Sequence, residues 1–372
     1  MELRSPGVPM TEAERQLVAF VNDTDSGLRE EFAVRFEQSA DAIEKAGLAR
    51  TSSVNEGRDL LHEALHENTI RRLRKLIGPV VKGRNRVAIL IDNLDKAWDR
   101  QADLDAVSHL LLGLLSAVGQ VSVEYQKEDF WRDRVSISLA TFLRSDIYAY
   151  LQRAAREPDK IPVSILSWDN QELLLRVIEE RFLAVRPPGA DSSQLWTQFF
   201  TAVVSGRPTK EYLLWRSLPR PRDIVYLCNA ATTAAINAQH DAVLERDFLL
   251  AEQNYSQWAL EALIVENGIT ISEFESVLFE FAGCRANLGR SAVQAIIRNV
   301  VKDEAKAEQV LDRLQEMSFV GREVADHRFA YPEIGPDSRK VDVLSRKLAE
   351  RKRGEPRLEI HPAYRPYLEI AD

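Results

Sequence analysis

The chain has 372 residues, of which 45% are hydrophobic and 28% are charged. This composition is typical of a globular protein, and because a single core stops growing at about 250 to 300 residues, we expect two or three domains. The formal net charge of −8 argues against a protein whose main task is to neutralise nucleic-acid phosphates, although a local basic patch remains compatible with it.

The cysteine content and the absence of targeting patterns indicate the compartment. Only Cys228 and Cys284 occur, far apart and without metal-binding spacing, so we expect neither a disulfide framework nor a zinc site. The first residues do not combine a basic start with an apolar core, and no stretch approaches the roughly 18 uncharged apolar residues of a membrane span. We therefore expect a cytoplasmic protein that does not enter a membrane.

The first half of the chain predicts helices followed by an alternation of strands and helices. Residues 11–78 place apolar side chains at helical spacing, and the basic hinge 82–86 leads into VAILI, an apolar run that fits a strand covered on both faces. This alternation is the pattern of a doubly wound parallel sheet, whose ligands lie at the carboxyl ends of the strands. The expected elements are strand 87–91, helix 104–121, strand 135–143, helix 144–155, strand 162–166 and helix 169–185.

The second half predicts mainly helices. The Pro- and Gly-containing segment 186–193 is the first expected domain boundary, and a helical lid follows to about residue 255. Three short helices and two β-runs joined by a polar turn then predict a winged-helix domain, and the tail 357–370 could add a strand. The expected helices are 271–284, 290–301 and 305–317, and the expected β-runs are 319–324 and 327–332. The expected domains are 1–190, 191–257 and 258–372.

The segment VAILIDNLDKAWD, residues 87–99, carries the most chemical information. A strand that ends in Asp92 places a carboxylate where Mg²⁺ and nucleotide phosphates lie in a P-loop fold. Magnesium prefers oxygen ligands and keeps several waters, so one carboxylate at this position is sufficient. Asp95 has two interpretations: it polarises the attacking water, or it is an ordinary helix N-cap.

Three segments, in the same order, resemble those of the STAND-like P-loop ATPases of bacteria, a group of the AAA+ kind. They are ILIDNLDKAW, FLRSDIY (142–148) and LPRPRDIVYLCNAA (218–231), and the resemblance covers about residues 80–235. It implies a fold of the class α/β plus all-α: a partial P-loop NTPase parallel sheet with a helical lid, followed by the winged helix. It also implies ATP and Mg²⁺ as cofactors and an ATPase activity.

The resemblance assigns roles to individual residues. Asp92 matches the Walker B metal ligand, and Arg144 lies where a sensor-1 residue reads the γ-phosphate, although it could instead pair with Asp146 or Asp92. In RPRDIV, Arg222 resembles a sensor-2 arginine that reaches back to the nucleotide, the alternative being a basic turn on a solvated surface. Many relatives have glutamate directly after the Walker B aspartate, whereas this chain has Asn93.

The sequence contains no GxxxxGK[ST] run, the loop that surrounds nucleotide phosphates with backbone N–H groups and a lysine. Three explanations are open: a truncated or split chain, a partner that supplies the loop, or a degenerate module kept for assembly. Because the opening residues look like an irregular surface loop rather than the natural start of a fold, we favour truncation of the chain or an alternative start. We expect the chain alone to bind ATP weakly or not at all, and hence to be inactive as an ATPase by itself.

Two functions follow. The first is a nucleotide-dependent regulatory switch or motor subunit of the AAA+/STAND type, whose relatives often serve bacterial defence or stress signalling, acting through self-association or a partner protein. The alternative is a non-enzymatic interaction or nucleic-acid-associated protein on an inert P-loop scaffold. The third helix of the winged helix is acidic, so base reading is not expected, but a basic run could contact nucleic acid. That run contains Arg346, Lys347, Arg351, Lys352 and Arg353.

Overall fold

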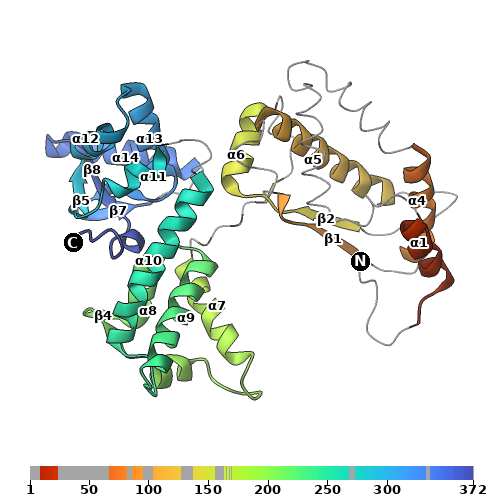
Figure 1. Cartoon of the computed structure of the whole chain (residues 1–372), viewed down its shortest axis with the longest axis horizontal. Helices are drawn as coiled ribbons and strands as arrows, with labels where there is room; N and C mark the ends of the chain where they lie inside the picture. Colours follow the sequence, from red (N-terminus) through yellow and green to blue (C-terminus); the bar gives the residue numbers. More distant parts are fainter. Residues whose placement is uncertain are drawn as a thin grey trace. The chain divides into compact units, whose positions relative to one another are not determined.

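The chain divides into two compact units, Met1–Val163 and Ser164–Asp372, and each is considered by itself (Figure 1). The computed structural model describes residues 9–23, 67–81, 86–94, 104–126, 137–155, 163, 164, 166, 168, 170–267, 273–331 and 336–371. None of the helices within these ranges is long and apolar enough to cross a membrane.

The first unit combines helices with one pair of parallel strands. Its described elements are α1 (Glu12–Asp23), α4 (Glu67–Val81), β1 (Val87–Ile91), α5 (Leu104–Gln126), β2 (Ile137–Thr141) and α6 (Ser145–Ala154). Helix α1 packs on α4, and α5 packs on both β2 and α6. The expected strands 87–91 and 135–143 and the helix after each of them are thus confirmed, and the helices within 11–78 are confirmed where residues are described.

Two expectations for this sheet are wrong. We expected β1 to be covered on both faces, but Leu90 is 67% exposed and Ile89 is 38% exposed. We also expected a third strand at 162–166, yet Val163, Ser164 and Leu166, the described residues of that run, are not in a strand. An apolar run predicts a strand only where neighbouring strands complete its hydrogen bonds, and within the described residues β1 pairs with β2 alone.

The second unit begins with a helical part. It contains α7 (Gln171–Leu183), the π-helical turn η5 (Leu195–Phe199), the hairpin β3 (Val203–Val204) and β4 (Arg207–Pro208), α8 (Thr209–Arg216), α9 (Pro221–Asn237) and α10 (Glu245–Asn267). The long helices α9 and α10 pack against each other, as Figure 1 shows. Fully buried aromatic side chains, Tyr212, Phe248 and Tyr255, fill the space between these helices.

The second unit ends in a small sheet with helices around it. The elements are α11 (Phe274–Phe279), β5 (Asn287–Gly289), α12 (Arg290–Val300), α13 (Glu304–Glu316), β6 (Val320–Ala325), β7 (Arg328–Ala330), α14 (Pro336–Lys352), β8 (Arg357–Ile360) and the short 3₁₀ turn η6 (Pro362–Tyr364). The sheet has the order β5-β8-β6-β7 and is antiparallel. The expected three helices, the two β-runs and the tail strand are present, and the tail strand lies inside the sheet, not at its edge.

The boundary between the two units differs from the expected domain boundaries. One hydrophobic core runs from Leu174 in α7 to Ile370 near the end of the chain, so the segments 191–257 and 258–372 share a core. Helix α7, which we had grouped with residues 1–190, packs on α8 and α9 and belongs to the second unit. Polar and proline-rich composition marks a surface segment, but it does not tell whether the elements on either side share a core.

The side chain of His361, between β8 and η6, makes the stability of the second unit pH-dependent. His361 is 6% exposed, its Nδ1 accepts a hydrogen bond from the Ala363 N–H at 3.1 Å, and its ring contacts Tyr331. Burial, aided by the nearby Arg365 and Arg216, lowers the pKa of His361 to about 3. The folded state therefore holds this histidine neutral, whereas an unfolded histidine titrates near about 6.5.

We predict that this contribution to stability is complete above about pH 6.5 and is lost as the pH falls toward about 3, because only the unfolded state then gains the proton. The loss from this residue should approach about 1.4 kcal/mol per pH unit within that window. In urea unfolding at several pH values, the variant His361→Asn, which keeps a capping acceptor but does not titrate, should show a shallower pH dependence than the wild type. Equal slopes for the two proteins would contradict the prediction.

Candidate functional site

The carboxyl ends of β1 and β2 form the edge at which the predicted site residues meet. The strands are parallel and paired in register from Val87 with Ile137 to Ile91 with Thr141. The ladder continues one step further, because the Phe142 N–H donates to the Ile91 carbonyl at 2.8 Å. The residues that follow each strand therefore leave the sheet at the same edge, although 52 positions separate Asp92 from Arg144 in the sequence.

Asp92 is exposed at this edge and is oriented by a tight local turn. Its Oδ1 accepts the N–H of Asn93 at 2.8 Å, and Asn93 has a left-handed backbone with φ of 62°. Asparagine is among the residues that tolerate this conformation best. The next residue, Leu94, is 1% exposed and anchors the turn. One oxygen of the Asp92 carboxylate is thus used by the turn, and the other can serve a ligand.

Arg144 occupies the N-cap position of α6, three residues after β2 ends. Its backbone is extended, its side chain is half-buried, and no side chain caps the helix. The first-turn N–H groups of a helix lack partners within the helix and carry partial positive charge, so a helix that begins at this edge favours an anion there. The arginine and the start of α6 together give this edge a positive component beside the Asp92 carboxylate.

Thr141 is a polar residue of this edge that the sequence analysis did not single out. It is the last residue of β2, directly opposite Ile91, and its hydroxyl Oγ1 is buried without a hydrogen-bond partner in the described structure. A buried hydroxyl without a partner is costly and calls for an explanation such as a ligand or an ordered water. We had taken it as part of the expected strand 135–143, whereas a hydroxyl near the end of that strand, three residues before Arg144, was the available signal.

The structure brings two of the four predicted site residues together. Asp92 and Arg144 lie at one edge of the same sheet, while Asp95 lies outside the described residues. Arg222 belongs to the second unit, so its convergence on the same pocket stays a prediction. The described residues include no group of three or more His, Cys, Asp or Glu side chains that could hold a metal, and Asp92 offers a single carboxylate.

Arg222 is held by the first turn of α9, which is fixed by a buried polar chain. Pro221 is at the first helical position, and the neighbouring Asp223 is only 3% exposed. The Tyr255 hydroxyl donates to Asp223 Oδ1 at 2.9 Å and accepts the Leu218 N–H at 2.9 Å. Burial, together with the Asp223 carboxylate, raises the pKa of Tyr255 well above its usual value, so this hydroxyl stays protonated. The turn is rigid and presents Arg222 outward, toward solvent.

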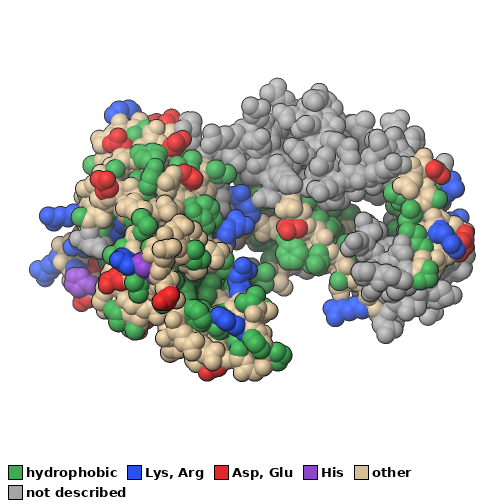
Figure 2. Space-filling view, turned by 60° about the horizontal axis from the view of Figure 1, so that its bottom comes forward, with side chains coloured by type: hydrophobic (Ala, Val, Ile, Leu, Met, Phe, Trp, Pro, Cys, Tyr) green, Lys and Arg blue, Asp and Glu red, His purple; other side chains and the backbone are tan. Residues whose placement is uncertain are grey.

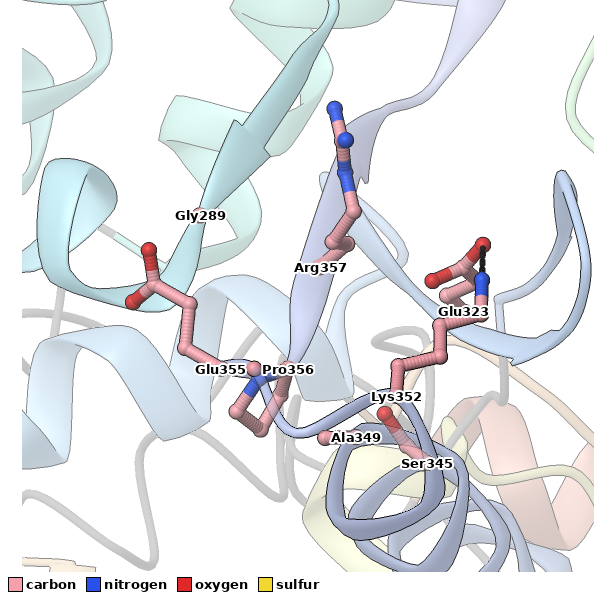
Figure 3. A pocket seen from close by; sticks show the side chains of 9 residues that line it. Gly289, Glu323, Ser345, Ala349, Lys352, Glu355, Pro356 and Arg357 are labelled. Atoms are coloured by element: carbon pink, nitrogen blue, oxygen red, sulfur yellow. Dashed lines mark hydrogen bonds and ion pairs between the residues drawn. The ribbon is translucent and has the colours of Figure 1, made fainter.

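Two hollows in the C-terminal part of the second unit are built from charged groups that already pair with one another. The first, about 360 Å³, is shown in Figure 3: Lys352 is 3.0 Å from Glu323, and Glu355 turns toward Gly289. Glu355 accepts the Ser291 N–H at 2.8 Å and so caps α12. The second, about 480 Å³, lies between α12, α13, β6 and α14. Neither hollow is lined by a predicted site residue.

Comparison with known proteins gives two similarities, one to a domain family and one to a single protein. Residues 171–264 match the family described as the FunZ-associated C-terminal helical domain, and this range spans α7 to α9 and most of α10. The "Putative transposon gamma-delta 80.3 kDa protein" of Escherichia coli (strain K12) is 23% identical over 193 residues, which is 50% of this chain. The match covers 26% of that protein, so the chain spans only about a quarter of the length of this relative.

The backbone of Asn93 generates a prediction about the residue next to Asp92. Because φ is 62° at this position, Asn93→Glu should destabilise the first unit by about 1 kcal/mol, whereas Asn93→Gly should be neutral or slightly stabilising. Thermal unfolding of both variants measures the difference, with Asn229→Glu at an exposed position of helix α9 as the matched control. An equal loss for Asn93→Glu and Asn93→Gly would show that the backbone conformation does not limit this position.

Proposed function

We propose that the chain is a nucleotide-dependent regulatory switch or motor subunit of the AAA+/STAND ATPase type. The observation that carries the proposal is the meeting of Asp92, Thr141 and the Arg144 N-cap at the carboxyl edge of two parallel strands. This edge is where α/β proteins bind their ligands. It combines a carboxylate for a metal ion, donors for phosphate oxygens and the start of a helix.

Each residue has a distinct part in the proposed chemistry. Mg²⁺ on the nucleotide would neutralise phosphate charge, and the Asp92 oxygen that the turn leaves available would hold that ion directly or through water. The guanidinium of Arg144 would bind phosphate oxygens with two donors, and its charge does not depend on pH. The hydroxyl of Thr141 would donate to a phosphate oxygen or to a water of the ion. The missing phosphate-binding loop would come from outside the present sequence or from a partner chain.

The proposed lid is the helical part of the second unit, and buried contacts link it to the C-terminal part. Arg216 at the end of α8 is 2.7 Å from Glu252 on α10 and donates to the Pro362 carbonyl at 2.9 Å. Gln253 on the same helix donates to the Pro366 carbonyl at 3.3 Å. We propose that Arg222 would move α9 and α10 when it binds the nucleotide. The tail would then move with them, because these contacts connect it to α8 and α10.

The C-terminal part would pass this change to a partner or to a second copy. The elements α11, β5, α12, α13, β6 and β7 follow the order expected of a winged helix, and we propose that arrangement for it. The similarity to a protein named for a transposon leaves open whether the partner is a protein or a nucleic acid. A role in defence or stress signalling is part of the proposal by family resemblance alone.

We predict that the full chain binds ATP with Mg²⁺ at a dissociation constant of about 1 mM, equivalent to about 4 kcal/mol. Saturation-transfer NMR of ATP, with Mg²⁺ and with excess chelator, measures this range directly. Asp92→Asn keeps the acceptor for the Asn93 N–H but removes the charge, so it should abolish the Mg²⁺ dependence. Arg144→Gln should weaken binding about tenfold, the equivalent of a lost charged hydrogen bond.

The matched controls are Asp241→Asn and Arg181→Gln, which make the same changes at exposed positions of the second unit. Both should bind ATP as the wild type does. Binding that does not depend on Mg²⁺, or an effect of Asp241→Asn as large as that of Asp92→Asn, would refute the site. Sub-micromolar binding by this chain would instead refute the need for a separate phosphate-binding loop.

A further inference from the structure

Helix α14 has one face in the fold and another that carries uncompensated positive charge. Its inner face packs on β6 and includes Ser345 and Ala349, which are 3% and 7% exposed. On the outer face, Lys340, Lys347 and Arg351 are exposed, and none of them forms an ion pair with a described residue. Their spacing of seven and four residues places all three along one stripe of the helix, about 16 Å from end to end.

The acids near this stripe are largely occupied by other cations. Asp342 lies next to Arg346 and is 3.8 Å from Arg322 on β6. Glu355 caps α12. On α14 itself, Glu350 remains as an exposed carboxylate opposing the basic side chains. The stripe therefore stays positive on balance, in a chain whose net charge is −8.

A salt bridge joins the turn between β6 and β7 to the end of α14. Lys352 lies 2.6 Å from Asp326 in the turn and 3.0 Å from Glu323 on β6. The neighbours of these partners, Arg328 beside the turn and Arg353 after the helix, are both exposed. The bridge holds the hairpin turn against the end of α14 and leaves Arg328 and Arg353 as exposed cations there. Figure 2 shows Lys and Arg side chains that project at the left of the view.

We propose that this surface, the outer stripe of α14 with the β6–β7 turn, binds the phosphate backbone of double-stranded DNA without reading its sequence. A duplex presents a dense line of negative charge, and lysine and arginine that contact it release bound counterions. The five cations of the surface are Lys340, Lys347, Arg351, Arg353 and Arg328.

Two other polyanionic partners fit the surface less well. Single-stranded nucleic acid is held largely by stacking on aromatic side chains, and among the described residues of α14 and the turn no Phe, Tyr or Trp side chain is exposed. A membrane surface would require the apolar face of a basic amphipathic helix, but the face of α14 that contains Ala349 is packed on β6, and the exposed large apolar side chains among the described residues of this helix are Val343 and Leu344. The proposal is independent of nucleotide binding, since it uses none of Asp92, Arg144 and Arg222.

The proposal also changes which residues of the basic run expected from the sequence are available to bind nucleic acid. Of its five residues, Arg346 and Lys352 are engaged by Asp342, Glu323 and Asp326, so their charges are compensated within the fold. Lys347, Arg351 and Arg353 keep exposed charges. Substituting Arg346 or Lys352 would also remove an ion pair within the chain, whereas substituting Lys347, Arg351 or Arg353 would remove only an exposed charge.

The test is fluorescence anisotropy of a labelled duplex of about 20 base pairs with the full chain, measured over a series of salt concentrations. Lys347→Gln combined with Arg351→Gln should weaken binding at low salt about tenfold or more, and the slope of log K against log salt should fall by about 1.8. The control pair, Arg181→Gln with Arg285→Gln, removes the same charge from exposed positions elsewhere and should change neither quantity. Circular dichroism melting of both double variants confirms that they remain folded.

If the test pair and the control pair weakened duplex binding equally, the binding would reflect the overall charge of the chain. That result would overturn the proposal. So would the absence of saturable binding at low salt. The chain could also bind a single strand, or vesicles of anionic lipid, more tightly than it binds the duplex. Either result would assign the surface to a different partner and would reject the proposal. Two duplexes of unrelated sequence should bind equally well, since no base contacts are invoked.

Discussion

The parallel pairing of β1 with β2 is the constraint on which the candidate site depends. An antiparallel pair would place the residue after one strand beside the residue before the other, and Asp92 and Arg144 would then lie at opposite edges. Parallel strands need a long connection, and α5 supplies it by crossing from β1 to β2 and packing on the sheet. The site is therefore a consequence of topology, since neither residue has any local reason to be near the other.

In the second unit, buried polar contacts hold distant elements of the chain in one arrangement. Arg216, with 10% of its side chain exposed, is shared between Glu252 on α10 and the carbonyl of Pro362 in the tail. A charge removed from water in this way is costly to leave unpaired, so helices α8 and α10 and the tail keep one arrangement. The tail then supplies β8, which pairs with β5 on one side and β6 on the other. On the proposed function, a movement of the helical part would reach the sheet through these contacts.

The sequence predicted the elements that depend on local pattern and missed those that depend on distant partners. The run VAILI and the charged residue after it sufficed to place β1 and Asp92, and the tail 357–370 was expected to be able to add a strand, which is β8. The run 162–166 is equally apolar, but Val163 and Leu166 are 46% and 80% exposed, because no adjacent strand accepts them. The burial of Asp223 could not be foreseen, since the Tyr255 hydroxyl from which it accepts a hydrogen bond lies 32 residues away in the sequence. The shared core of the segments expected as lid and winged helix is a further property of packing, which composition does not report.

The left-handed conformation of Asn93 bears on what kind of ATPase this edge could support. A glutamate directly after the aspartate would have to adopt a backbone that branched and long side chains disfavour, whereas asparagine takes it at little cost. The same turn uses one Asp92 oxygen to hold the Asn93 N–H, which fixes the carboxylate, and within the described residues 86–94 Asp92 is the only acid. On the proposed function, this edge would hold the nucleotide through Asp92. The signal would then be whether the nucleotide is bound, and the contacts of α8 and α10 with the tail would pass that state to the rest of the second unit.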